Sequence, residues 1–138
     1  MRFELCRGDL PPIEEVVRYL ERREETGCFA VFTGVVRGIS KSGERVVALY
    51  YEANEGAARR AFEKIVGELE KKYGIHDALL YHKLGKAYVG DRVMYVAVSA
   101  RGRAEAFAAL RELVDRVKRE VPIWKKEITE RGEYWVEE

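Results

Sequence analysis

Two lysines near the end of the chain have a spacing that suits chemistry on an anion. Lys118 and Lys125 are seven residues apart and stand on either side of Pro122. Because proline ends a helix and reverses the chain, we expect the two side chains to converge. Trp124 is expected to anchor the following segment against the core and so to fix Lys125. Positioned lysines can stabilise negative charge and transfer protons. The alternative is that Lys118 is an ordinary lysine favoured by the dipole at a helix end.

Three arginines are candidates for binding the anion itself. Arg37 ends a β-rich run and is followed by Gly38, which permits close backbone approach. Arg101 and Arg103 stand at the start of a predicted helix, where unpaired amide groups attract anions. At 100° per residue, Arg103 lies on the same side of that helix as Lys118. The alternatives are a solvated Arg37 and helix arginines that pair with nearby carboxylates.

Other catalytic and metal-binding motifs lack a required residue or the required spacing in this sequence. Gly38 and Gly43 have the spacing of a phosphate-binding loop, but Glu44 follows where that loop needs lysine. The only histidines, His76 and His82, would lie about 20 Å apart along a strand, too far for one zinc ion. We therefore expect no metal, and we expect both histidines to be structural or surface residues.

The composition limits the class of protein. The 138 residues are expected to form one domain, residues 1–138, and the net charge of +1 disfavours a general nucleic-acid binder. No apolar run is long enough for a membrane span, and no signal core is present, which favours the cytoplasm. Cys6 and Cys28 are isolated in apolar stretches and are expected to be small buried residues. The absence of Gln and the single Asn, within 36% charged residues, favour a thermophilic source.

The elements that must position these residues follow from hydrophobic periodicity and from proline and glycine. Strands alternate with helices and with pairs of strands, which predicts an α+β domain with a mixed or mainly antiparallel sheet. The apolar side of the third helix is predicted to be Ala106, Phe107, Leu110, Leu113, Val114 and Val117. The predicted strands are 2–6, 28–36, 45–53, 75–84, 91–100, 123–129 and 133–137, the predicted helices are 12–24, 55–73 and 103–120, and 85–90 is predicted to be a turn.

Taken together, these segments resemble the large subunit of molybdopterin synthase. The resemblance covers roughly residues 15–137, and five blocks in the same order carry it. Those blocks are Phe32-Thr33-Gly34-Val35-Val36-Arg37, His82-Lys83-Leu84-Gly85, Val89-Gly90-Asp91-Arg92-Val93, Ala106-Phe107 with Asp115-Arg116-Val117-Lys118, and Pro122-Ile123-Trp124-Lys125-Lys126-Glu127.

The resemblance implies a single-domain α/β hammerhead fold with three main helices, and a homodimer of large subunits. Each large subunit would bind one small ubiquitin-like sulfur-carrier subunit, which gives a heterotetramer. The carrier's C-terminal Gly-Gly thiocarboxylate would deliver sulfur twice to cyclic pyranopterin monophosphate and form the dithiolene of molybdopterin. No cofactor is implied, because the sulfur arrives on the partner.

The resemblance also assigns roles within the site. It implies that Lys118 and Lys125 are catalytic and that Arg37 and Arg103 bind the substrate; the neighbouring candidates are Arg101, Lys126 and Phe32. One position departs from the family, because Gly102 stands where a histidine is common. Either Arg101 substitutes for that histidine or the site binds less tightly. Two other readings stay open: a non-catalytic module that binds an anionic ligand, and a nucleic-acid-binding domain.

Overall fold

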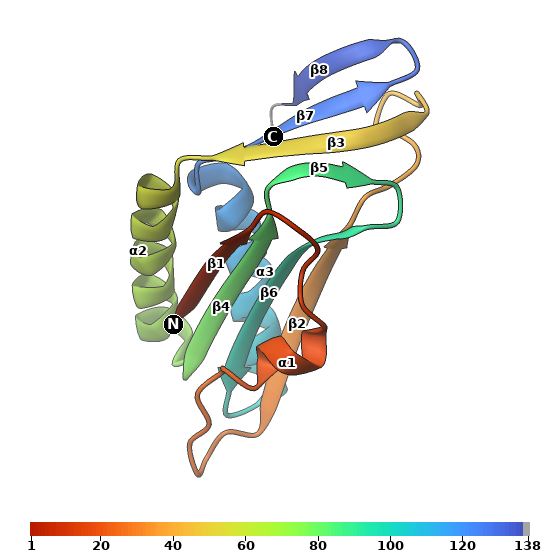
Figure 1. Cartoon of the computed structure of the whole chain (residues 1–138). Coiled ribbons are helices and arrows are strands. Elements are labelled where there is room, and N and C mark those ends of the chain that lie inside the picture. The colour runs from red at the N-terminus through yellow and green to blue at the C-terminus, as the bar shows by residue number, and fades with distance from the viewer. Residues whose placement is uncertain (137–138) are drawn as a thin grey trace.

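Eight strands form two sheets within residues 1–136, the part of the chain that the computed structural model describes (Figure 1). The first sheet has the order β1-β4-β6-β2 and is mixed, because β1 runs parallel to β4 and the other neighbours are antiparallel. The second sheet has the order β5-β3-β7-β8 and is antiparallel. The strands are β1 (Arg2–Cys6), β2 (Cys28–Val35), β3 (Val46–Ala53), β4 (Asp77–Lys83), β5 (Gly85–Tyr88), β6 (Arg92–Ala100), β7 (Ile123–Thr129) and β8 (Gly132–Val136).

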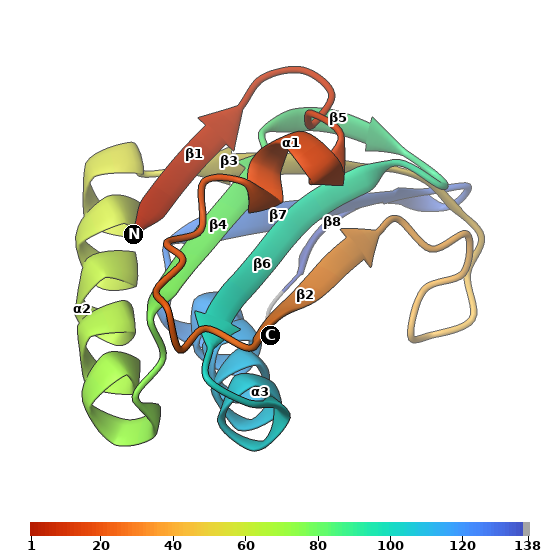
Figure 2. The ribbon, with the colours of Figure 1, turned by 90° about the horizontal axis from the view of Figure 1, so that it is seen from below.

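Helices cover both faces of the first sheet (Figure 2). Helices α2 (Glu55–Tyr73) and α3 (Arg103–Glu120) pack on one face and form the main core, which also takes in side chains of β3. The short helix α1 (Ile13–Val17) lies on the other face, where Val16 packs with Leu79 and Tyr95 in a second cluster. Because it is covered on both sides, β4 is buried along its whole length.

The two long helices begin and end as the sequence predicts. The side chain of Asn54 accepts a hydrogen bond from the amide of Ala57 (3.1 Å) and caps the start of α2. Gly74 ends that helix in the left-handed conformation, with φ of 69°. Helix α3 ends directly before Pro122, which cannot continue it. The predicted ranges 55–73 and 103–120 are therefore confirmed. Phe107 was placed wrongly on the buried side of α3, because its side chain is 66% exposed.

The predicted first helix, which was to run to about residue 24, was wrong. Only Ile13–Val17 is helical, although Val16 and Leu20 are buried as their spacing suggests. Backbone groups that would form hydrogen bonds within a longer helix form hydrogen bonds with distant side chains instead. The amide of Glu21 donates to Asp77 Oδ2 (2.8 Å), and the carbonyl of Glu21 accepts from Ser99 Oγ (3.0 Å). The chain is thereby held across the ends of the inner strands β4 and β6 instead of forming a longer helix.

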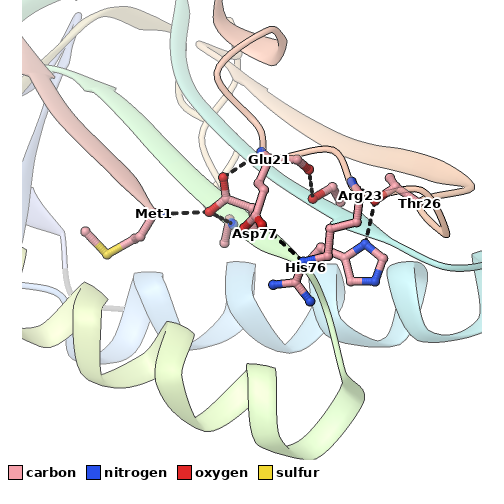
Figure 3. A network of polar contacts seen from close by, with 8 residues as sticks. Met1, Glu21, Arg23, Thr26, His76 and Asp77 are labelled. Atoms are coloured by element: carbon pink, nitrogen blue, oxygen red, sulfur yellow. Dashed lines mark hydrogen bonds and ion pairs between the residues drawn. The ribbon is translucent and has the colours of Figure 1, made fainter.

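Asp77 is the centre of that polar network (Figure 3). Besides Glu21, its carboxylate contacts the Met1 ammonium group (2.7 Å) and the amide of Ala78 (2.8 Å). Beside it, His76 Nδ1 lies 2.6 Å from the hydroxyl of Thr26. His76 is buried and serves the structure here, in agreement with the sequence-based prediction.

The predicted turn 85–90 was also wrong in part, because residues 85–88 form β5 and pair with β3. Gly85 has φ of 85°, a conformation open to glycine at little cost. This residue allows the chain to leave β4 in the first sheet and enter β5 in the second. The true turn follows at Tyr88–Asp91, where the amide of Tyr88 donates to Asp91 Oδ2 (2.8 Å). The β4–β5 connection thus ties the two sheets together.

Candidate functional site

A cleft of about 930 Å³ opens between the two sheets beside the end of α3. Its walls come from β2 and β6 on one side and from β3 and β7 on the other, with β4 contributing one residue. The volume is in the range of small-molecule binding sites. Among its polar and aromatic lining residues are Phe32, Arg37, Tyr51, His82, Lys118, Arg119, Glu120, Trp124, Lys125 and Glu127.

The cleft brings together Lys118 and Lys125. Lys118 lies in the last turn of α3, and Lys125 lies on β7 after a two-residue junction. That junction is fixed by backbone hydrogen bonds. The amide of Val121 donates to Val117 (3.2 Å), and the carbonyl of Pro122 accepts from the amide of Asn54 (3.2 Å). Both lysines therefore project from backbone that is held in place.

Trp124 does not anchor β7 against the core, and that expectation was wrong. Its side chain is 51% exposed and borders a second groove of about 380 Å³ with Glu52 and Trp135. Alternation along the strand explains this, because Ile123 and Lys125 take the face toward the main core and the cleft. Lys125 is positioned by strand pairing instead, since it lies directly opposite Tyr51 of β3.

Arg37 and Phe32 reach the same cleft from β2. Phe32 is half-buried within the strand, and Arg37 is exposed just beyond its end. Two backbone hydrogen bonds hold the residue before Arg37: the amide of Val36 donates to Asp91 (3.0 Å), and its carbonyl accepts from Gly90 (2.9 Å). Arg37 is thus an exposed cationic side chain on a fixed backbone that lines the cleft.

Three predicted site residues lie outside this cleft in a single chain. Arg101 and Arg103 are exposed at the opposite end of α3. Arg103 precedes Lys118 by fifteen residues, which is about 22 Å along a helix. Lys126 projects from the other face of β7, where its ammonium group contacts Glu133 (3.3 Å) and lies over the rings of Tyr50 and Trp135.

The side chain of Glu105 lies close to Gly102 at the start of α3. Gly102 is the N-cap residue and supplies no side-chain cap. A Cβ atom there would come within 2.7 Å of Glu105 Oε1. The carboxylate of Glu105 therefore occupies the space that a larger residue would need, and any side chain at position 102 requires Glu105 to move.

His82 is a cleft residue that the sequence interpretation missed. It lies on β4, is only 6% exposed, and packs edge-on against the ring of Tyr51 with ring centroids 4.7 Å apart. Burial, together with the nearby charges of Lys118 and Lys125, lowers the pKa of His82 to about 4, although a hydrogen bond to the carbonyl of Lys83 acts in the opposite direction. A histidine within a wholly buried strand needs a partner for its ring, and that was the available signal.

Neither cysteine belongs to this cleft. Cys6 and Cys28 are unpaired and half-buried at strands β1 and β2. Burial raises the pKa of the Cys6 thiol, which disfavours the reactive thiolate. No group of three or more potential metal ligands occurs within residues 1–136, and no helix there is long and apolar enough to cross a membrane.

Comparisons with known proteins show the family of this chain and agree with its fold. The family model "MoaE protein" matches residues 9–120. A molybdopterin synthase catalytic subunit from Pyrococcus abyssi is 41% identical over 125 residues, which is 91% of this chain and 83% of that protein.

Solved structures confirm the predicted fold class. A molybdopterin synthase from Staphylococcus aureus superposes with a TM-score of 0.88 at 32% identity, covering 99% of this chain and 97% of the other. A complex of subunits 1 and 2 of molybdopterin-converting factor from Helicobacter pylori contains a chain with a TM-score of 0.76 at 23% identity, covering 99% and 90%. The family match and the similarity at the level of sequence together place this chain in the MoaE protein family, the family of the molybdopterin synthase catalytic subunits.

Proposed function

We propose that this chain is the catalytic subunit of a molybdopterin synthase. It takes sulfur from the thiocarboxylated Gly-Gly terminus of a small ubiquitin-like subunit and inserts it into cyclic pyranopterin monophosphate. The observation that carries this proposal is one cleft, in a member of the MoaE family, that holds Lys118, Lys125 and Arg37. The proposed compartment is the cytoplasm.

The residue types suit the two charges that the reaction must manage. The substrate carries a phosphate, and a guanidinium group binds phosphate through paired, charge-assisted hydrogen bonds. The thiocarboxylate sulfur forms a bond to an electrophilic carbon of the pterin as a carbon–oxygen bond there breaks. Water then hydrolyses the resulting thioester, so the sulfur stays on the pterin and a carboxylate remains on the carrier after each transfer. Ammonium groups beside the reacting atoms stabilise the negative charge that develops and donate a proton to the departing oxygen. In this proposal Arg37 binds, and Lys118 and Lys125 act on the reacting centre.

The sulfur source is proposed to be a separate protein. Both cysteines lie away from the lysines, and burial raises the pKa of Cys6. The Helicobacter pylori protein of the same fold is solved as a complex of two subunits. A carrier whose flexible terminus enters the cleft would supply sulfur without any thiol from this chain.

We also propose a homodimer of this chain, and a heterotetramer once two carriers bind. Arg101 and Arg103 are about one helix length from Lys118, so a second copy is needed to bring them to the cleft. Exposed apolar residues on edge strand β2, Val31 and Val35, offer a surface for it. Light scattering at micromolar concentration should give twice 15.9 kDa. A monomer mass at every concentration would remove the proposal.

A mixing experiment tests whether the second copy completes the site. Lys118→Ala and Arg103→Ala chains, each nearly inactive alone, are unfolded together and refolded. Mixed dimers then carry one intact site, so activity should recover to about a quarter of the parent value under random pairing. Recovery would fail if Arg103 serves the cleft of its own chain or none.

Arg37→Ala is expected to weaken substrate binding more than it slows chemistry. Loss of one charged hydrogen bond costs about 1.5–3 kcal/mol, which corresponds to a roughly 10- to 150-fold rise in KM. Steady-state kinetics with the phosphorylated pterin measure this. Arg60→Ala, which removes an exposed arginine of α2, is the control and should leave KM unchanged. An equal fall in kcat with unchanged KM would instead place Arg37 at the reacting centre.

The reaction itself decides between the enzyme and a ligand-binding module. The chain is mixed with a thiocarboxylated small subunit and the cyclic pterin, and molybdopterin is assayed. Formation of molybdopterin only when all three are present supports the proposal. Tight binding of the pterin without product, under conditions in which the carrier also binds, would favour the non-catalytic module.

A further inference from the structure

His82 places an uncharged nitrogen acceptor in the cleft close to two cations, Lys118 and Lys125. Its ring lines the cleft together with Lys118 and Lys125 but comes from a different sheet than Lys125. Nδ1 lies 2.8 Å from the carbonyl oxygen of Lys83, and a carbonyl can only accept. Nδ1 therefore carries the proton, and in a neutral ring Nε2 must present a lone pair.

The surroundings keep that ring neutral and fixed. Tyr51 from β3 packs against it, Lys118 approaches from α3, and Lys125 approaches from β7. A third positive charge beside two ammonium groups in a buried position is strongly unfavourable. Buried polar nitrogens ordinarily have a partner, so Nε2 of this buried ring calls for a hydrogen-bond donor. The two groups whose charge reaches the ring, Lys118 and Lys125, are ammonium groups, which can only donate hydrogen bonds.

We propose that His82 is a positioning residue of the lysine site, whose Nε2 accepts a hydrogen bond from the ammonium group of Lys118. Lys118 is the partner because its charge acts on the ring more strongly than that of Lys125. Lys125 is aligned separately, since it faces Tyr51 across the β3–β7 pair. His82 thereby aims one of the two lysines at the reacting atoms without adding charge. This role rests on the proposed function of the cleft.

The first test is nuclear magnetic resonance of the chain alone, with ¹⁵N-labelled histidine. With only two histidines present, the spectrum can be assigned directly. At pH 7 His82 should be neutral with its proton on Nδ1, and Lys118→Met should shift the Nε2 resonance. The matched control is Lys64→Met, which removes an exposed lysine of α2 and should leave that resonance in place. A proton on Nε2, or a resonance that ignores Lys118→Met, overturns the proposal.

The second test is a double-mutant cycle in the reconstituted reaction. His82→Phe keeps the ring volume but removes the acceptor, and should lower kcat by about 10-fold with little change in KM, whereas His82→Gln restores most of the rate. In a Lys118→Ala background, His82→Phe should have less than about a twofold effect. Equal losses in both backgrounds would show that His82 does not act through Lys118. If the parent forms no molybdopterin, the proposed function fails, while the resonance experiment still decides the contact.

Discussion

Replacing Lys118 or Lys125 by alanine is expected to lower turnover by about 100-fold or more, the lower range for positioned acid–base groups. Both side chains line one cleft, and each projects from backbone that is fixed by its neighbours. Single-turnover formation of molybdopterin, with this chain in excess over carrier and pterin, measures the chemical step. Lys64→Ala on the exposed side of α2 is the matched control and should retain the parent rate.

The Lys118→Ala chain should stay folded and lose no more than about 1–3 kcal/mol of stability, the cost of leaving the buried Nε2 of His82 without its donor. Lys118 is exposed, so denaturant unfolding can separate a catalytic loss from a folding defect. A double variant that still forms molybdopterin at the parent rate would contradict both the assignment of the lysines and the cleft as the reacting site.

Acid should destabilise this protein partly through His82. Its pKa is about 4 in the folded chain, against 6.5 for the ordinary side chain. Between those values the unfolded chain binds the proton and the folded chain does not. Stability is therefore complete above about pH 6.5 and falls as the pH drops toward 4. The expected contribution from this one residue is about 3 kcal/mol at pH 4.

A comparison with His82→Phe isolates that contribution. Both chains contain the same carboxylates, so their acid sensitivity cancels when urea unfolding is measured across pH 4 to 7. The parent should lose about 3 kcal/mol relative to the variant over this range. Parallel stability curves would mean that His82 gains its proton without unfolding the chain, and that burial does not hold its ring neutral.

Local patterns were sufficient to predict the long elements. The 3.6-residue periodicity of 55–73 and 103–120, with Gly74 and Pro122 at their ends, is a property of neighbouring residues alone. Tertiary contacts decided the remainder. Asp77 and Ser99, which are far from Glu21 in the sequence, form hydrogen bonds with its backbone amide and carbonyl. The first helix is shorter than predicted for that reason. Pairing with β3 turned 85–88 into a strand for the same kind of reason.

The candidate site likewise contains residues that local sequence patterns suggest and residues that only the tertiary structure brings together. Lys118 and Lys125 were identifiable because Pro122 and their spacing are visible along the chain. The place of His82 in the cleft could not be predicted in this way. It depends on β4 lying close to Tyr51 of β3, Lys125 of β7 and Lys118 of α3. Trp124 shows the converse error: a large aromatic suggested an anchor, but the strand directs it outward. Arg103 lies at the opposite end of α3 from Lys118, so its proposed place in the site depends on the proposed second copy of the chain.

The alternation of side chains on the two faces of β7 determines what a one-residue deletion before this strand would do. Lys125 lies toward the cleft, and Lys126 lies on the opposite face. A shift of one residue exchanges the faces of a strand. Deletion of one residue at the Val121–Pro122 junction would therefore bring Lys126 opposite Tyr51. An ammonium group would still enter the cleft, although Trp124 would turn inward and strain the core. Two consecutive lysines would therefore keep an ammonium group in the cleft after such a deletion, and the main cost of the deletion would fall on packing.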